Sequence, residues 1–160
     1  MATHTITTIE GKPFILDGEW YYPVQDATED ITIVLSRRAC QAGVRKGVAN
    51  DPHHCHYATA FMEEKEAGVL SVYVRKSYTY LRLKRHPGAF IKYMNPNYVR
   101  DYIQEFDERA GRAVHFGDDM TCELMAVPES QRQGYRQRKN RRDVSLPKQK
   151  RKKARRTSFR

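Results

Sequence analysis

The sequence lacks the long apolar segments of membrane and secreted proteins. Its longest apolar run is about five residues, Ile31–Leu35 with Thr32 inside it, whereas a membrane-spanning helix needs about 20. The opening residues, MATHTITTIEGK, contain no apolar region of a signal peptide. Three cysteines, an odd and sparse number, indicate free thiols in a reducing compartment. We therefore expect a cytoplasmic protein without a membrane partner.

The sequence also lacks the short motifs of common enzyme classes. It has no glycine-rich phosphate loop, no G-x-S-x-G and no H-E-x-x-H. Each of these motifs places a nucleophile, a base or backbone amides where chemistry requires them. Without them the sequence predicts a non-enzymatic protein with no cofactor.

Two groups of residues resemble metal ligands, and we expect neither to be a metal site. His53, His54, Cys55 and His56 follow one another at a predicted helix start, where consecutive side chains diverge by about 100° and at most two can converge. His115, Asp118, Asp119 and Glu123 could hold a hard cation. Because Gly117-Asp118-Asp119 is also typical of an ordinary turn, a small metal-dependent nuclease remains only an alternative.

Positive charge is concentrated in a C-terminal arm. Residues 130–160 hold fourteen Lys and Arg against one acid, Asp143, a net charge of +13. The whole chain carries +10, so residues 1–129, which we call the body, carry −3. The basic character is therefore a property of one segment.

Such an arm cannot form a core of its own, and we expect it to be disordered when free. Lys and Arg docked on phosphates release condensed counterions, and guanidinium groups bind phosphate in a bidentate manner. A nuclear address signal, an acidic protein partner and a membrane surface are alternatives. The predicted nucleic-acid-binding residues of the arm are Arg132, Arg136, Arg138, Lys139, Arg141, Arg142, Lys148, Lys150, Arg151, Lys152, Lys153, Arg155 and Arg156.

Hydrophobic periodicity predicts a small α+β domain in the body. Aromatic residues flank the turn signal Asp17-Gly18, which indicates a short hairpin or an irregular cover. Extended segments are expected at Ile31–Leu35, Val69–Val74, Tyr78–Leu83, Ala89–Met94 and Met120–Val127. A short helix is expected over Arg37–Ala42, capped by Ser36 and closed by Gly43, and two main helices over Pro52–Glu66 and Pro96–Glu108.

The predicted faces of these elements identify core and surface. Cys55, Ala58, Thr59 and Met62 recur at helical spacing, so we expect that stripe to face the sheet, with the three histidines at the surface. One face of the 69–83 hairpin carries Tyr73, Arg75, Tyr78, Tyr80 and Arg82. Tyr78, Tyr80, Arg75 and Arg82 are predicted to contact nucleic acid, with the tyrosines stacking on bases. Cross-strand pairing, or burial of this face under the N-terminal segment, is the alternative.

Two short motifs resemble a class of small uncharacterised bacteriophage and bacterial proteins. They are the helix start Asn50-Asp51-Pro52-His53-His54-Cys55-His56-Tyr57-Ala58 and the helix end Tyr102-Ile103-Gln104-Glu105-Phe106-Asp107. The similarity covers roughly residues 31–126, and His56 stands where the class usually has proline. The resemblance implies a phage-like source and a small α+β domain, and it carries no assigned chemistry.

The sequence thus predicts an N-terminal cover segment (1–30), an α+β domain (31–128) with an antiparallel-rich sheet and two main helices, and a basic arm (129–160). We expect a protein that binds nucleic acid, RNA slightly favoured over DNA. The alternative is a phage-type inhibitor or virion protein that docks on a host protein through its acidic body.

Overall fold

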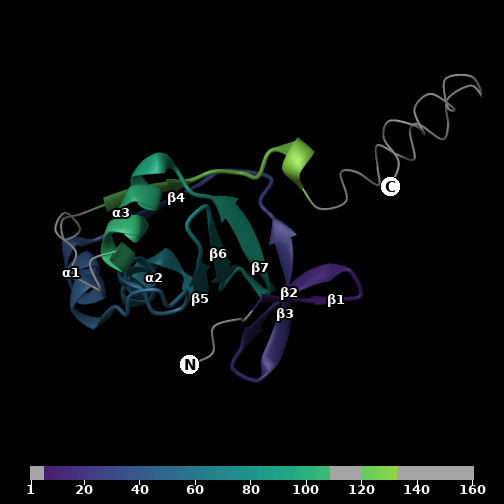
Figure 1. Ribbon diagram of the computed structural model, residues 1–160, viewed down its shortest axis with the longest axis horizontal. Coiled ribbons are helices and arrows are strands. Elements are labelled where there is room, and N and C mark those ends of the chain that lie inside the picture. Colours follow the sequence, from purple (N-terminus) through teal and green to yellow (C-terminus); the bar gives the residue numbers. More distant parts are fainter. Residues whose placement is uncertain (1–5, 109–119, 133–160) are drawn as a thin grey trace, which may run out of the picture. The chain divides into compact units, whose positions relative to one another are not determined.

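The computed structural model describes residues 6–108 and 120–132. By its contacts the chain divides into two units, Met1–Ala126 and Val127–Arg160. The described part of the second unit contains one short 3-10 helix, η2 (Glu129–Gln131). The first unit is a mixed α/β structure, which confirms the predicted class, and Figure 1 shows its helices gathered at one end of a curled sheet.

Six strands form the main sheet in the order β1-β2-β3-β7-β6-β5. Their bounds are β1 Ile6–Ile9, β2 Lys12–Asp17, β3 Trp20–Asp26, β5 Val69–Val74, β6 Tyr78–Leu83 and β7 His86–Met94. All neighbouring strands run antiparallel except β3 and β7, which are parallel. The predicted strands over 69–74, 78–83 and 89–94 are confirmed, and the last begins three residues earlier.

Two tight turns build the N-terminal strands into this sheet. Gly18, with a φ of 67°, lies in the β2–β3 turn beside the Asp17–Trp20 pair, which confirms the hairpin predicted at Asp17-Gly18. Glu10 and Gly11, with φ of 53° and 78°, join β1 to β2. Two residues with positive φ match the right-handed twist of the strands they connect. Because β3 pairs with β7, residues 6–26 are part of the sheet.

Strands β4 (Ile31–Leu35) and β8 (Met120–Leu124) form a separate two-stranded sheet. The predicted strand at 31–35 is confirmed. Ile33 and Leu35 are its buried residues, and they pair with Cys122 and Met120 of β8. A bridge between Met94 and Met125, with N–O distances of 2.8 and 3.0 Å, connects this ribbon to β7. A ribbon with one buried face is sufficient to close the core beneath it.

Three α-helices, the predicted short helix and the two predicted main helices, pack at the β5 end of the sheet (Figure 1). They are α1 Arg37–Lys46, α2 His56–Glu63 and α3 Asn97–Glu108, and a 3-10 turn, η1 Lys65–Ala67, follows α2. Ser36 caps α1 as predicted, its hydroxyl accepting from the amide of Ala39. The predicted end at Gly43 is wrong, because α1 continues to Lys46.

Glycine lies inside α1 because a second helix approaches it there. A Cβ on Gly43 would stand 2.3 Å from the carbonyl oxygen of His56, and a Cβ on Gly47 would stand 2.6 Å from the amide nitrogen of His56. No side chain fits at either distance. Gly43 and Gly47 therefore allow the start of α2 to lie directly against α1.

Helix α2 begins at His56, later than the Asp51-Pro52 signal predicts. Cys55 is its N-cap, with Sγ accepting from the amide of Ala58 at 3.4 Å. The predicted buried stripe is only half right: Cys55 and Ala58 are buried, whereas Met62 is 45% exposed. The buried side chains include His56, Tyr57 and Phe61, because α2 contacts α1, α3 and β5 on different sides.

Helix α3 confirms the prediction for 96–108, with Val99, Ile103 and Phe106 buried. They join Tyr57, Phe61 and other residues of the main core. Within the part of the chain that the structure describes, no helix is long and apolar enough to cross a membrane.

Candidate nucleic-acid interface

The tyrosine face of the β5–β6 hairpin is partly covered. Tyr73 and Tyr80 are 1% and 7% exposed, and they pack with Ile15, Val24 and Phe90 in a second apolar cluster. This cluster forms because β2 and β3 extend the sheet so that it curls over the hairpin. The structure thus agrees with burial under the N-terminal segment at these two positions, and a base could stack on Tyr80 only if the cluster opened.

Arg82, another predicted contact, is engaged within the protein. Its guanidinium lies 3.1 Å from a carboxylate oxygen of Asp17 and 3.2 Å from the carbonyl oxygen of Pro87, and its carbon is 4.3 Å from the ring centre of Tyr22. The side chain is 16% exposed. Arg82 therefore joins β6 to the β2–β3 hairpin, and its charge is largely neutralised there.

The exposed part of this face lies at the tip of the hairpin. Arg75 and Lys76 are exposed and Tyr78 is half-buried. The ammonium of Lys92 on β7 lies 4.1 Å from the ring centre of Tyr78. One cation, Lys92, thus lies over an accessible tyrosine ring, and Arg75 and Lys76 precede that tyrosine in the chain by three and two residues.

Asn95 holds the hairpin tip in place. Its side-chain amide donates to the carbonyl oxygens of Arg75 (2.9 Å) and Lys76 (3.1 Å), and its oxygen accepts from the hydroxyl of Thr79. Asn95 directly precedes the predicted helix start at Pro96, but its side chain is committed to this turn. A hydrogen-bonded turn replaces the Gly or Pro that a hairpin of this kind commonly uses.

Of the predicted arm residues, the structure describes only Arg132. Its Nε donates to the carbonyl oxygen of Val127 at 2.8 Å. Residues 133–160, with the other predicted arm contacts, lie outside the described residues, as do His115, Asp118 and Asp119.

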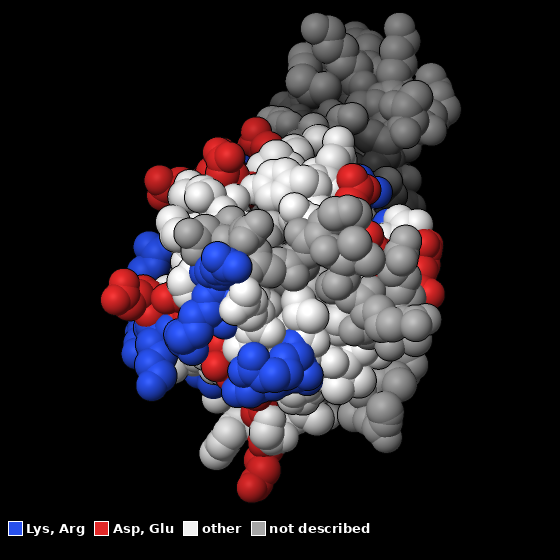
Figure 2. Space-filling view, turned by 90° about the vertical axis from the view of Figure 1, so that its left-hand side faces the viewer, with Lys and Arg blue, Asp and Glu red and all other residues white. Residues whose placement is uncertain are grey.

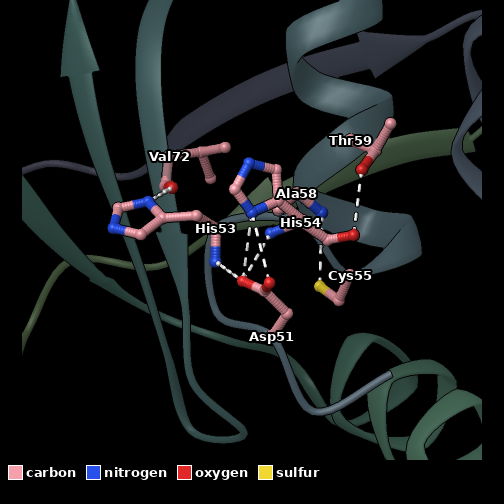
Figure 3. Close-up of polar contacts among 7 residues, drawn as sticks. All are labelled: Asp51, His53, His54, Cys55, Ala58, Thr59 and Val72. Atoms are coloured by element: carbon pink, nitrogen blue, oxygen red, sulfur yellow. Dashed lines mark hydrogen bonds and ion pairs between the residues drawn. The ribbon is translucent and has the colours of Figure 1, made fainter. Parts of the chain in front are cut away.

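His53 and His54 point in different directions (Figure 3). Asp51 accepts from the backbone amides of His53 and His54 and lies 3.2 Å from the ring Nδ1 of His54. The ring of His53 turns away to the carbonyl oxygen of Val72, 2.8 Å from its Nδ1. Within 6–108 and 120–132, no three His, Cys, Asp or Glu side chains are grouped so that they could hold a metal ion.

His56 is the exception to the expectation that these histidines lie at the surface. It is 0% exposed, and its ring stacks on Phe106 with 4.1 Å between ring centres and 20° between planes. Burial lowers the pKa of His56 to about 4, although nearby Glu105 acts in the opposite direction. The correction arises because α3 covers the first turn of α2, which sequence periodicity does not reveal.

This burial makes a testable contribution to acid sensitivity. An unfolded histidine titrates near pH 6.5, so between pH 6.5 and 4 the unfolded chain binds the proton and the folded chain does not. The stability contributed by neutral His56 is present above pH 6.5 and is lost as the pH falls to 4, by about 3 kcal/mol. Urea unfolding at pH 7 and pH 4 should show a smaller acid loss in His56→Gln than in the wild type.

His54→Gln is the matched control, because the His54 side chain is 69% exposed. Its acid loss should equal that of the wild type. If His56→Gln showed the same acid loss as His54→Gln, burial of the neutral imidazole would not explain the sensitivity.

The buried thiols are poorly suited to nucleophilic chemistry. Burial raises the pKa of Cys55 and of Cys122 to about 12, so neither is a thiolate at neutral pH. Cys55 serves as a helix cap, and Cys122 packs in the core.

Cationic residues outside the predicted set also lie exposed on the body. Lys76 is at the hairpin tip, and α1 presents Arg37, Arg38, Arg45 and Lys46. The sequence does contain the signal for α1, a ten-residue helix with four cations and no acid. This local positive charge is not visible in the net charges of the two segments, because the arm carries +13 and the body as a whole −3.

Comparisons with known proteins give no assignment for this arrangement. No protein-family model matches the chain, no curated protein matches its sequence, and no solved structure matches its fold.

Proposed function

We propose that this protein binds nucleic acid without catalysing a reaction, gripping phosphates through its basic arm, with RNA slightly favoured over DNA. The observation that carries the proposal is the separation of charge: +13 on residues 130–160 and −3 on the body. A segment with this density of cations gains most from a partner that releases many counterions, which is a polyanion. Arginine-rich segments that fold on binding are characteristic of RNA recognition.

The body supports this proposal through the hairpin tip. Lys92 lies over the ring of Tyr78, and Arg75 and Lys76 are exposed at the same hairpin tip, so all three could contact phosphates while the ring stacks on a base. This contact is smaller than the contribution of the arm. It would favour single-stranded segments, whose bases are free to stack.

The direct test is titration of the full-length protein with labelled single-stranded RNA, single-stranded DNA and duplex DNA at several salt concentrations. The proposal requires affinity that falls steeply with salt. Absence of binding to all three at 50 mM salt would refute it.

Replacing Tyr78 tests the body's part. If the ring stacks on a base, Tyr78→Ala should weaken binding to single-stranded RNA by about 1–3 kcal/mol, with little change on duplex DNA. Tyr21→Ala is the control, because Tyr21 is 52% exposed on β3 and away from the predicted face. Equal affinities for both variants and the wild type would show that the Tyr78 ring does not stack on a base and that binding depends on charge contacts.

One observation favours a second candidate function, docking on a protein. Trp20 and Tyr21 are the first residues of β3 and are 72% and 52% exposed. Exposed Trp and Tyr are enriched at protein interfaces. In an interaction protein, Trp20→Ala would abolish partner binding and removal of the arm would not, the reverse of the pattern expected for a nucleic-acid-binding protein.

A further inference from the structure

Helix α1 carries a concentration of positive charge that the net charge of the body conceals. Four of its ten residues are cationic, none is acidic, and all four are exposed. In Figure 2 the side of the molecule on which α1 lies faces the viewer, and Lys and Arg side chains gather there. The helix therefore presents a basic surface, the α1 face, defined by Arg37, Arg38, Arg45 and Lys46.

The spacing of these residues aligns two of them along the helix. Arg38 and Arg45 are seven residues apart, nearly two turns, so they lie on the same side with about 10 Å between their positions along the axis. Arg37 and Lys46, two and a half turns apart, lie at the two ends of this row and on opposite sides of it. An extended polyanion that follows the helix can meet several of these cations in succession.

Two of these cations stand where helix energetics disfavours them. Arg37 and Arg38 occupy the first turn, where the macrodipole favours acids and opposes cations. Local choices that oppose stability are characteristic of functional positions. A backbone phosphate bound between these two arginines would lower the local charge from +2 to +1 and weaken the unfavourable interaction with the macrodipole.

The neighbouring acids neutralise the α1 face only in part. Glu63 lies 2.9 Å from the ammonium of Lys46 and 3.7 Å from the guanidinium of Arg38, and these cations lower its pKa. The carboxylate of Glu64 accepts from the amide of Ser36 at 2.8 Å. Counted with residues 63–66, the surface has five cations, including Lys65, and three acids, including Glu66. A net positive surface remains on a body whose total charge is negative.

The helix is also held rigidly, which a positioning surface requires. Ser36 caps its start, and Gly43 and Gly47 seat it directly on the beginning of α2. Its cations therefore project from a fixed support, in contrast with side chains on a flexible loop.

We infer that the α1 face is a second phosphate-contact surface, which binds the backbone of the same nucleic acid that the arm grips. This inference rests on the proposed function and adds a site to it. Two linked contact surfaces on one chain raise the effective concentration of the second once the first has bound. The arm would supply most of the affinity, and the α1 face would set how the body sits on the strand.

The test is the double variant Arg37→Gln/Arg45→Gln, measured with the full chain on duplex DNA between 50 and 200 mM salt. Arg38 and Lys46 are left intact, because removing them would leave Glu63 without its cations. Two lost phosphate contacts should reduce the log–log salt slope by about 1.8 and weaken binding at 100 mM salt by about tenfold or more. Both positions are exposed, so the melting temperature should stay within a few degrees of the wild type.

Lys12→Glu is the matched control, since it makes the same change in net charge at an exposed position of β2. It should leave the slope unchanged. A wild-type slope in the double variant, or an equal loss in Lys12→Glu, would overturn the α1 face while the proposed function stands. Failure of the wild-type protein to bind would refute the proposed function itself, and the α1 face with it.

Discussion

Truncation after Pro128 should remove most of the affinity for nucleic acid and leave a folded body. The cut takes away the +13 of residues 130–160 and leaves a chain with net negative charge. If about 6–10 arm cations meet phosphates on duplex DNA, the full-length protein should show a log–log salt slope of about −5 to −9, with smaller values on single strands. Between 50 and 200 mM salt, affinity should then fall by a factor of about 10³–10⁵.

The same truncation should have little effect on the stability of the body, because the arm has few large apolar side chains to bury. Titration of both chains at two salt concentrations, with thermal melts followed by circular dichroism, measures both expectations. A full-length chain with every arm Arg changed to Lys is the control, because it preserves charge and removes bidentate contacts. Unchanged affinity after truncation would place the binding site on the body.

Gly43→Ala should destabilise the protein by about 2–3 kcal/mol, even though it lies within a helix. Helix propensity alone would make alanine about 1 kcal/mol more favourable than glycine. The new Cβ would stand 2.3 Å from the carbonyl oxygen of His56 and 3.2 Å from the Cβ of Ala60. Relief of that clash requires backbone movement of α1 away from α2, which costs the packing between them.

Gly88→Ala provides the comparison. A Cβ at Gly88 has no atom within 4 Å and the position is exposed, so its free energy of unfolding should change by no more than about 0.5 kcal/mol. Urea unfolding of the two variants separates close packing from a general effect of glycine replacement. A stabilised Gly43→Ala variant would show that α1 does not approach α2 so closely.

Local chemistry in the sequence is sufficient to predict many of the elements. Ser36 begins a helix because its hydroxyl can cap a free amide, and alternation over 69–83 produces two strands on either side of a turn. The stripe Val99, Ile103 and Phe106 identifies the buried side of α3 by its spacing alone. In each case the determining interactions lie within a few residues along the chain.

The errors occur where distant segments meet. Gly43 reads as a helix end, yet it lies inside α1 because α2 needs the space that a side chain would occupy. The pair Asp51-Pro52 predicts a helix start, but the Asp51 carboxylate accepts from the amide of His53 in a turn, and Cys55 is the N-cap of α2.

The candidate interface also has one part that the sequence predicts and one part that only the tertiary structure decides. The charge of the arm, and with it the proposal that the protein binds a polyanion, follows from the sequence alone, because net charge does not depend on the fold. Which side chains of the body can join that interaction depends on tertiary structure. Pairing of β3 with β7 curls the sheet over Tyr80 and brings Asp17 to Arg82. Asn95 fixes the backbone of the turn that contains Arg75 and Lys76, and α1 exposes its four cations to solvent. These outcomes were not predictable from local pattern, because burial is decided by contacts between residues far apart in the chain.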